Sequence, residues 1–195
     1  MSKGSGDGGT GGAAAPIVDR AIRAEAIAFS SKQPKQGSPP TPFRLRPDRT
    51  YTRKFFGDGQ LLMPDGNRVG FWGFEDDTSG RRLPSPLIRA TEGEVVHVTV
   101  HSSKRVHTSH LPGIEPEPWN DGVGHTSFEV TGQYTYQFRP ATAGTYFYHC
   151  HVNTVLHVQM GMFGALIVDP YPTHDADGRR LAFTGGPAYD VERLW

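Results

Sequence analysis

The segment from Tyr148 to Met162 constrains this chain more than any other. It begins Tyr-His-Cys-His, continues to His157 and ends in Met-Gly-Met. Cys150 in this segment is the single cysteine among 195 residues, so the chain cannot form an internal disulfide. A thiol, imidazoles and thioethers grouped so closely are the soft ligands that suit copper in an electron-transfer site. The fold must therefore bring sulfur and nitrogen ligands to a common point.

The spacing of the ligands supports one copper site. Cys150, His157 and Met162 follow the pattern Cys-x6-His-x4-Met, which lets one loop supply sulfur, nitrogen and sulfur. Copper in such a site is held by two imidazoles and a thiolate, with a distant thioether. His107 is the expected source of the other imidazole, because it follows a predicted strand after a short Ser-Ser-Lys-Arg turn. The alternative is that Cys150 is a small buried hydrophobic residue, as most lone cysteines are.

Period-two patterns predict strands along most of the chain from residue 43. In residues 95–101, Val96, Val98 and Val100 share one face, while two histidines and a threonine share the other. An Asp-Gly pair at residues 65–66, between two apolar runs, predicts a hairpin. Short strands between Gly and Pro turns, with no convincing helix, predict an all-β antiparallel sandwich or barrel.

Composition divides the chain into three parts. Residues 1–42 are rich in Gly, Ser and Pro and are expected to form a disordered tail and linker. Residues 43–172 carry the strand signals and form the predicted domain. Residues 173–195 form a C-terminal extension, either flexible or docked on a neighbour. Twenty basic and twenty acidic residues balance, which gives no sign of nucleic-acid or membrane-surface binding, and no apolar run approaches the ~20 residues of a membrane span.

Three segments carry a family resemblance. Residues 84–94, 144–151 and 161–168 resemble the entry strand, the copper strand and the following strand of multicopper oxidase and copper nitrite reductase domains. The resemblance covers roughly residues 50–170 and implies a single cupredoxin-like Greek-key β-sandwich. It also implies a type 1 copper with the ligands His107, Cys150, His157 and Met162. Met162 is preferred to Met160 because a glycine precedes the methionine in the family pattern.

A second copper centre is a hypothesis with an open alternative. His149 and His151 point to the face opposite Cys150 on a strand and cannot bind the same copper. In the resembled families such flanking histidines hold catalytic coppers, and His110 matches a further ligand there. Two departures weaken the match: Pro112 stands where multicopper oxidases have a ligand, and Thr108-Ser109 stands where nitrite reductases carry an acid. The alternative is that these histidines are solvent-facing or hydrogen-bonded.

The function expected from the sequence is a copper-dependent oxidoreductase of the multicopper oxidase superfamily. Type 1 copper would pass electrons to the second centre, which the resemblance places at a subunit interface of a homo-oligomer, a trimer in nitrite reductases. Its partner would be an electron donor or acceptor, either a small molecule or a redox protein. The alternatives are a single-copper electron carrier and a copper-binding assembly protein. The N-terminus shows no signal peptide, although the resembled proteins usually work in the periplasm or outside the cell.

Overall fold

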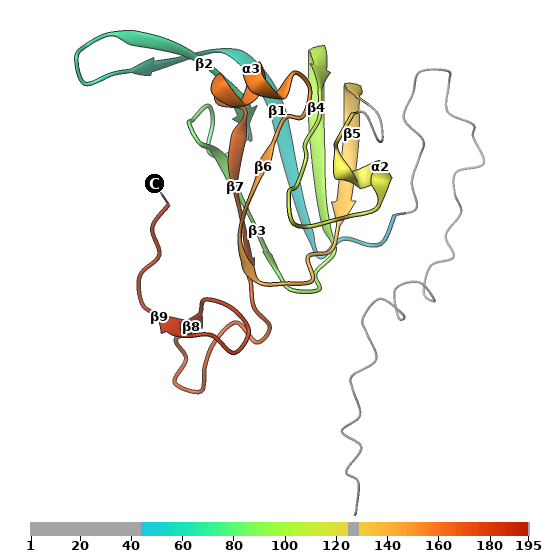
Figure 1. The fold of residues 1–195 in the computed structure, drawn as a ribbon, viewed down its shortest axis with the longest axis vertical. Coiled ribbons are helices and arrows are strands. Elements are labelled where there is room, and N and C mark those ends of the chain that lie inside the picture. The colour runs from blue at the N-terminus through green and yellow to red at the C-terminus, as the bar shows by residue number, and fades with distance from the viewer. Residues whose placement is uncertain (1–43, 125–128, 195) are drawn as a thin grey trace, which may run out of the picture.

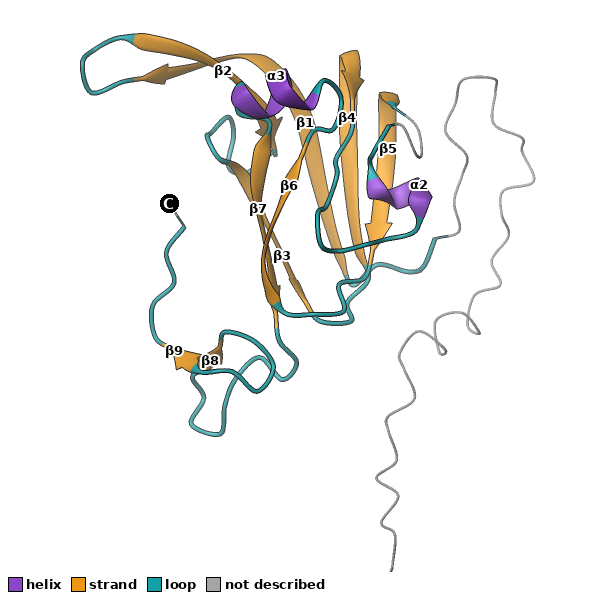
Figure 2. Ribbon diagram, in the orientation of Figure 1, coloured by secondary structure: helices purple, strands orange, loops and turns teal. Residues whose placement is uncertain are grey.

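Two β-sheets form the body of the protein. The computed structural model describes residues 44–124 and 129–194, with the backbone alone for 103 and 104. The predicted tail and linker over 1–42 therefore lie outside the described residues. The larger sheet has the strand order β2 (Arg68–Glu75), β1 (Arg49–Leu62), β4 (Val96–His107) and β5 (Val130–Phe138). The smaller sheet has the order β3 (Ser85–Thr91), β7 (Phe163–Asp169) and β6 (Gly144–His149). Figure 1 and Figure 2 show these two layers.

The sheets pair their strands in a mixed way. β1 pairs antiparallel with β2 but parallel with β4, and β3 pairs parallel with β7. The β4–β5 and β6–β7 pairs are antiparallel. The all-β sandwich is confirmed, but the expectation of antiparallel pairing throughout is wrong. Both parallel pairs join strands that are distant in sequence. The turn signals in the sequence predict only the pairing of consecutive strands, so they could not reveal these pairs.

Alternating side chains fill the space between the sheets. Val96, Val98 and Val100 on β4 are fully buried, whereas the three residues between and after them are half-buried, as the period-two pattern predicts. The opposite sheet contributes further buried residues to the same core, namely Ile88, Ala90, Leu166 and Val168. Cys150 and Met162 belong to this core as well. Cys150 and Met162 of the predicted metal segment are therefore packed inside the sandwich.

The hairpin predicted at residues 65–66 connects β1 and β2. Leu62 pairs with Arg68, and Gly66 adopts a left-handed conformation with φ of 86°. The Asn67 N–H donates to a carboxylate oxygen of Asp65 at 2.9 Å, which closes the turn. Figure 1 shows that this hairpin projects beyond the body of the sandwich.

Two local expectations near the metal segment are wrong. The stretch between Cys150 and Met162 was expected to be a loop, but it contains a short helix, α3 (Thr154–Gln159), which carries His157. Residues 102–105 were expected to form a turn before His107, but β4 continues through them to His107, and its pairing with β5 shifts register between Ser102 and His107. A second short helix, α2 (Pro118–Asp121), precedes β5. None of the helices among the described residues is long and apolar enough to cross a membrane.

The C-terminal extension docks on its own domain. Two short strands, β8 (Arg180–Leu181) and β9 (Ala188–Tyr189), pair with each other. Arg89 on β3 binds the carboxylate of Glu192 at 2.8 Å and that of Asp169 at 2.7 Å. The extension is thereby attached to the smaller sheet by an ion-pair network.

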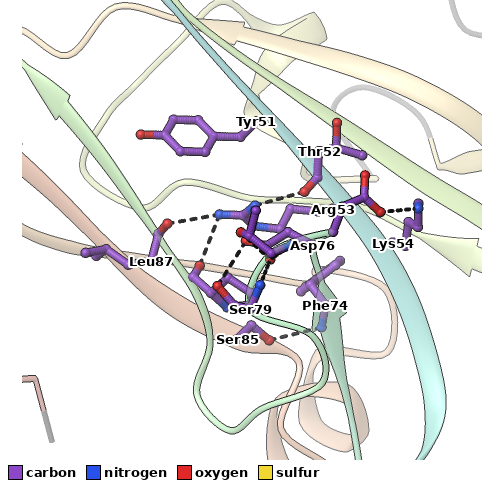
Figure 3. Close-up of polar contacts among 12 residues, drawn as sticks. Tyr51, Thr52, Arg53, Lys54, Phe74, Asp76, Ser79, Ser85 and Leu87 are labelled. Carbon is purple, nitrogen blue, oxygen red and sulfur yellow. Dashed lines mark hydrogen bonds and ion pairs between the residues drawn. The ribbon is translucent and has the colours of Figure 1, made fainter.

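A buried arginine fastens the two sheets near the metal segment. Arg53 on β1 is 1% exposed and donates hydrogen bonds to the carbonyls of Pro86 and Leu87 on β3, as Figure 3 shows for Leu87. It also donates to the Tyr148 hydroxyl at 3.2 Å, and that hydroxyl donates to the Pro86 carbonyl at 2.6 Å. Tyr148 lies on β6 two residues before Cys150. The network therefore links β1 of one sheet to β3 and β6 of the other.

Candidate metal centre

Three predicted ligands converge on one point in the core. The Cys150 sulfur lies 3.5 Å from His107 Nδ1 and 3.2 Å from His157 Nδ1. Among the residues that the structure describes, this is the one group in which three such ligand atoms all lie within 4.8 Å of one another. All three side chains are buried. They come from the end of β4, the residue after β6, and α3.

Backbone hydrogen bonds hold the fourth predicted ligand beside them. The Cys150 N–H donates to the Met162 carbonyl at 3.1 Å, and the Met162 N–H donates to the His157 carbonyl at 3.0 Å. Met162 is fully buried and packs in the same core cluster as Cys150. Met160 is half-buried, and its carbonyl accepts the Trp72 N–H at 2.8 Å. The structure thus places Met162, and not Met160, in the core with Cys150.

The electrostatics of the group match a soft metal ion. Burial lowers the pKa of His107 to about 4, so this imidazole is neutral at pH 7, the form that binds metals. Burial likewise lowers the pKa of His157 and raises the pKa of the Cys150 thiol. A bound cation would offset the cost of burying a thiolate. A thiolate, two imidazoles and a nearby thioether are the donors that suit copper, so the residues present fit that metal.

Two aromatic side chains of the larger sheet cover the histidines. The Phe55 ring on β1 lies against the His107 ring, with centroids 3.7 Å apart. The Trp72 ring on β2 meets the His157 ring edge to face at 5.5 Å. These contacts fix the planes of both imidazoles and keep the ligand group away from bulk water.

The three other predicted histidines form a separate cluster. His110 and His149 exchange both backbone hydrogen bonds, at 2.8 and 3.0 Å, and this short bridge places their rings together. His110 Nδ1 lies 3.2 Å from His149 Nε2. The ring centroid of His151 is 5.0 Å from that of His110 and 5.6 Å from that of His149. The flanking residues of Cys150 therefore share a cluster that excludes Cys150 itself.

Burial acts on two histidines of this cluster, and a ring nitrogen of the third lacks a hydrogen-bond partner in the described part of the chain. Burial is the main cause that lowers the pKa of both His110 and His149. His149 Nδ1 lies 2.9 Å from the Cys150 carbonyl, and His151 Nδ1 is buried without a hydrogen-bond partner among the described residues. Three imidazoles grouped in this way form a metal-prone set.

An acidic residue near this cluster was not predicted from the sequence. Asp121, the last residue of α2, lies 3.6 Å from His110 Nε2. The tight turn at Gly122 brings Asp121 there. Gly122 has a φ of 72° and passes so close to the preceding segment that a Cβ on it would lie 2.1 Å from the Ser109 carbonyl. The signal in the sequence is the Asp-Gly pair, which marks a tight turn but not its spatial neighbour. Thr108 helps to hold the cluster in place, because its hydroxyl accepts a hydrogen bond from the His151 N–H at 2.9 Å.

A family model described as multicopper oxidase matches residues 66–173, which is more than half of the chain. The chain belongs to the multicopper oxidase family. This confirms the resemblance seen in the sequence and copper as the metal of the family. Copper resistance protein A of Pseudomonas syringae pv. tomato is 40% identical over 91 residues, which cover 45% of this chain and 15% of that protein. L-ascorbate oxidase of Nicotiana tabacum is 32% identical over 129 residues, covering 60% of this chain and 21% of that protein.

Solved structures of the multicopper oxidase family share the fold. The multicopper oxidase mgLAC superposes with a TM-score of 0.55 at 35% identity, covering 63% of this chain and 39% of its own. The blue copper oxidase from Nitrosomonas europaea gives a TM-score of 0.55 at 31% identity, covering 65% and 42%. The cupredoxin-like fold is thereby confirmed. The chain spans about a fifth or less of the two curated relatives and less than half of each of these solved chains.

Proposed function

We propose that the chain provides the type 1 copper domain of a copper-dependent oxidoreductase. His107, Cys150, His157 and Met162 would hold this copper. The observation that carries the proposal is the convergence of the Cys150 sulfur with two Nδ1 atoms at 3.5 and 3.2 Å inside the core. Bound copper would supply one-electron redox chemistry at this point. The chain supplies a dry, preformed set of donors whose planes are fixed by Phe55 and Trp72.

We further propose that His110, His149 and His151 belong to a second copper centre that another chain or domain completes at an interface. His149 and His151 are each one peptide from Cys150, so a short covalent path joins the thiolate to both imidazoles. Three imidazoles lie together here, whereas the family resemblance requires eight histidines for a complete trinuclear cluster. The remaining ligands would come from the partner, and a small acceptor such as dioxygen would be reduced there.

Copper content and spectra on protein of known oligomeric mass test both parts. We expect an intense thiolate-to-copper band that disappears in Cys150→Ser, with copper still retained at the second site. His110→Gln combined with His149→Gln should remove the second copper and leave the band intact. His97→Gln, a matched change of a half-buried histidine on β4, should affect neither.

Three outcomes would count against these assignments. A band that survives in Cys150→Ser refutes the type 1 site. One copper per chain in every oligomeric state, with no loss on changing His110 and His149, refutes the second centre and leaves a single-copper electron carrier. Copper binding without any thiolate band points instead to a copper-binding assembly protein.

A further inference from the structure

A buried unit charge lies in the layer of side chains next to the candidate metal centre. Arg53 on β1 is 1% exposed, and it lies two residues before Phe55, whose ring packs against His107. Its Nε donates to the hydroxyl of Tyr148 on β6, two residues before Cys150. Because two residues of a strand span roughly 7 Å, the guanidinium lies one layer of side chains, on the order of 10 Å, from the ligand group.

Most of the hydrogen-bond acceptors around Arg53 are neutral. Three of them are backbone carbonyls, those of Thr52, Pro86 and Leu87, at 2.8, 3.2 and 3.0 Å. The fourth is the Tyr148 hydroxyl, which keeps its own proton because it donates to the Pro86 carbonyl at 2.6 Å. These four groups satisfy the donors of the guanidinium but leave its positive charge uncompensated.

Asp76 is the ion-pair partner of Arg53 among the described residues. Its carboxylate lies 3.5 Å from the guanidinium, and Figure 3 shows the two side chains together. Burial acts to raise the pKa of Asp76, but hydrogen bonds from Ser79 and Thr78 and the charge of Arg53 outweigh it and hold this pKa below its ordinary value, so the carboxylate is ionised at pH 7. The Asp76 side chain is 17% exposed and that of Arg53 is 2% exposed. Water therefore screens the carboxylate more than the guanidinium, and the pair leaves a net positive potential in the core.

We propose that this buried pair sets the reduction potential of the type 1 copper site, with the Arg53 guanidinium raising the potential and the Asp76 carboxylate opposing that effect. The inference rests on the proposed function, because it concerns the copper of that site. Reduction adds one electron and lowers the charge of the site by one, so a fixed positive charge nearby favours the reduced form. No bond forms or breaks in this step, and neither Arg53 nor Asp76 gains or loses a proton. Because the pair is buried, its effect should persist at high salt, unlike that of a surface charge.

Spectroelectrochemistry of the copper-loaded full chain, followed through the thiolate band, tests the proposal. Arg53→Met should lower the reduction potential. At a fixed applied potential, the ratio of oxidised to reduced protein should therefore rise about tenfold, the size expected for a unit charge roughly 10 Å away at an effective dielectric constant of about 20. Asp76→Asn should shift the potential in the opposite direction and by less, because its carboxylate is more exposed. Arg53→Lys keeps the positive charge and loses the planar set of donors, so the potential should stay close to that of the wild type although the protein loses stability. Lys54→Met, which removes an exposed cation from the same strand, should change the ratio far less, and that change should vanish at high salt.

Several outcomes would overturn the proposal. An unchanged potential in Arg53→Met would show that the charge does not act on the site. A shift in Arg53→Lys as large as that in Arg53→Met would assign the effect to the lost hydrogen bonds, and a thiolate band that moves together with the potential in Arg53→Met would assign it to altered ligand geometry. A lower potential in Asp76→Asn would contradict the predicted sign. Unchanged potentials with an intact band refute this inference alone, whereas the absence of the band from the wild-type protein refutes the proposed function itself.

Discussion

Replacing the buried Arg53 by methionine would remove the guanidinium that joins β1 to the smaller sheet. Arg53 donates to the carbonyls of Thr52, Pro86 and Leu87 at 2.8, 3.2 and 3.0 Å, and to the Tyr148 hydroxyl at 3.2 Å. Methionine keeps most of the apolar stem and none of these donors. Removing one partner of a buried ionic network typically costs about 3–5 kcal/mol.

The groups that remain decide where in this range the variant lies. The Pro86 carbonyl keeps the Tyr148 hydroxyl at 2.6 Å. The Asp76 carboxylate, which lies 3.5 Å from the Arg53 guanidinium, keeps the backbone N–H groups of Thr78 and Ser79. Because these acceptors stay partnered, we expect the lower end, about 3 kcal/mol, which is roughly a hundredfold change in the unfolding equilibrium. Urea denaturation of the metal-free protein should then show a midpoint lower by about 1–2 M.

Lys54 on the same strand provides the control. Its ion pair with Asp77 is exposed, with 45% and 73% of the two side chains accessible. Lys54→Met should therefore cost no more than about 1 kcal/mol. If Arg53→Met and Lys54→Met shifted the midpoint equally, the reasoning from burial would be refuted.

Three further predictions concern the candidate metal centre. Gly161→Ala should lower the stability measured in thermal unfolding by about 2 kcal/mol or more, because φ of Gly161 is 112° and the added Cβ would lie 2.8 Å from the Trp72 carbonyl. Gly66→Ala, at φ of 86° with nothing within 4 Å of the added Cβ, should cost only about 1 kcal/mol. Equal losses in the two variants would contradict the crowding argument. The metal-free protein should lose stability as the pH falls from about 6.5 to about 4, because burial lowers the pKa of His107 to about 4 and the unfolded chain therefore binds that proton first. Urea denaturation at a series of pH values should show that His107→Gln flattens this pH dependence of the unfolding free energy, and an unchanged slope would contradict the prediction. Met162→Leu should keep the thiolate band and lower the unfolding free energy by less than about 1.5 kcal/mol. The reduction potential measured by spectroelectrochemistry should shift because the thioether is lost, and an unchanged potential would show that Met162 does not act on the metal.

Local patterns in the sequence predicted much of the fold. The alternation of residues 95–101 predicted which side chains of β4 are buried, since a strand turns successive side chains to opposite faces. The same parity predicted that His149 and His151 would part from Cys150, and the rings of the two histidines do lie in a separate cluster with His110. The hairpin at Gly66 followed from a left-handed turn that glycine favours.

Contacts between distant segments were decided only by the tertiary structure. The parallel pairing of β1 with β4, the approach of Asp121 to His110 and the placement of Phe55 and Trp72 over the histidines all join residues far apart in the chain. The helix that carries His157 was also missed, because six residues are too few to display a helical period. The ligand types and their spacing are properties of the chain itself. The distances among them and the burial that keeps His107 neutral exist only once the two sheets have packed, because burial and long-range pairing are properties of the folded molecule.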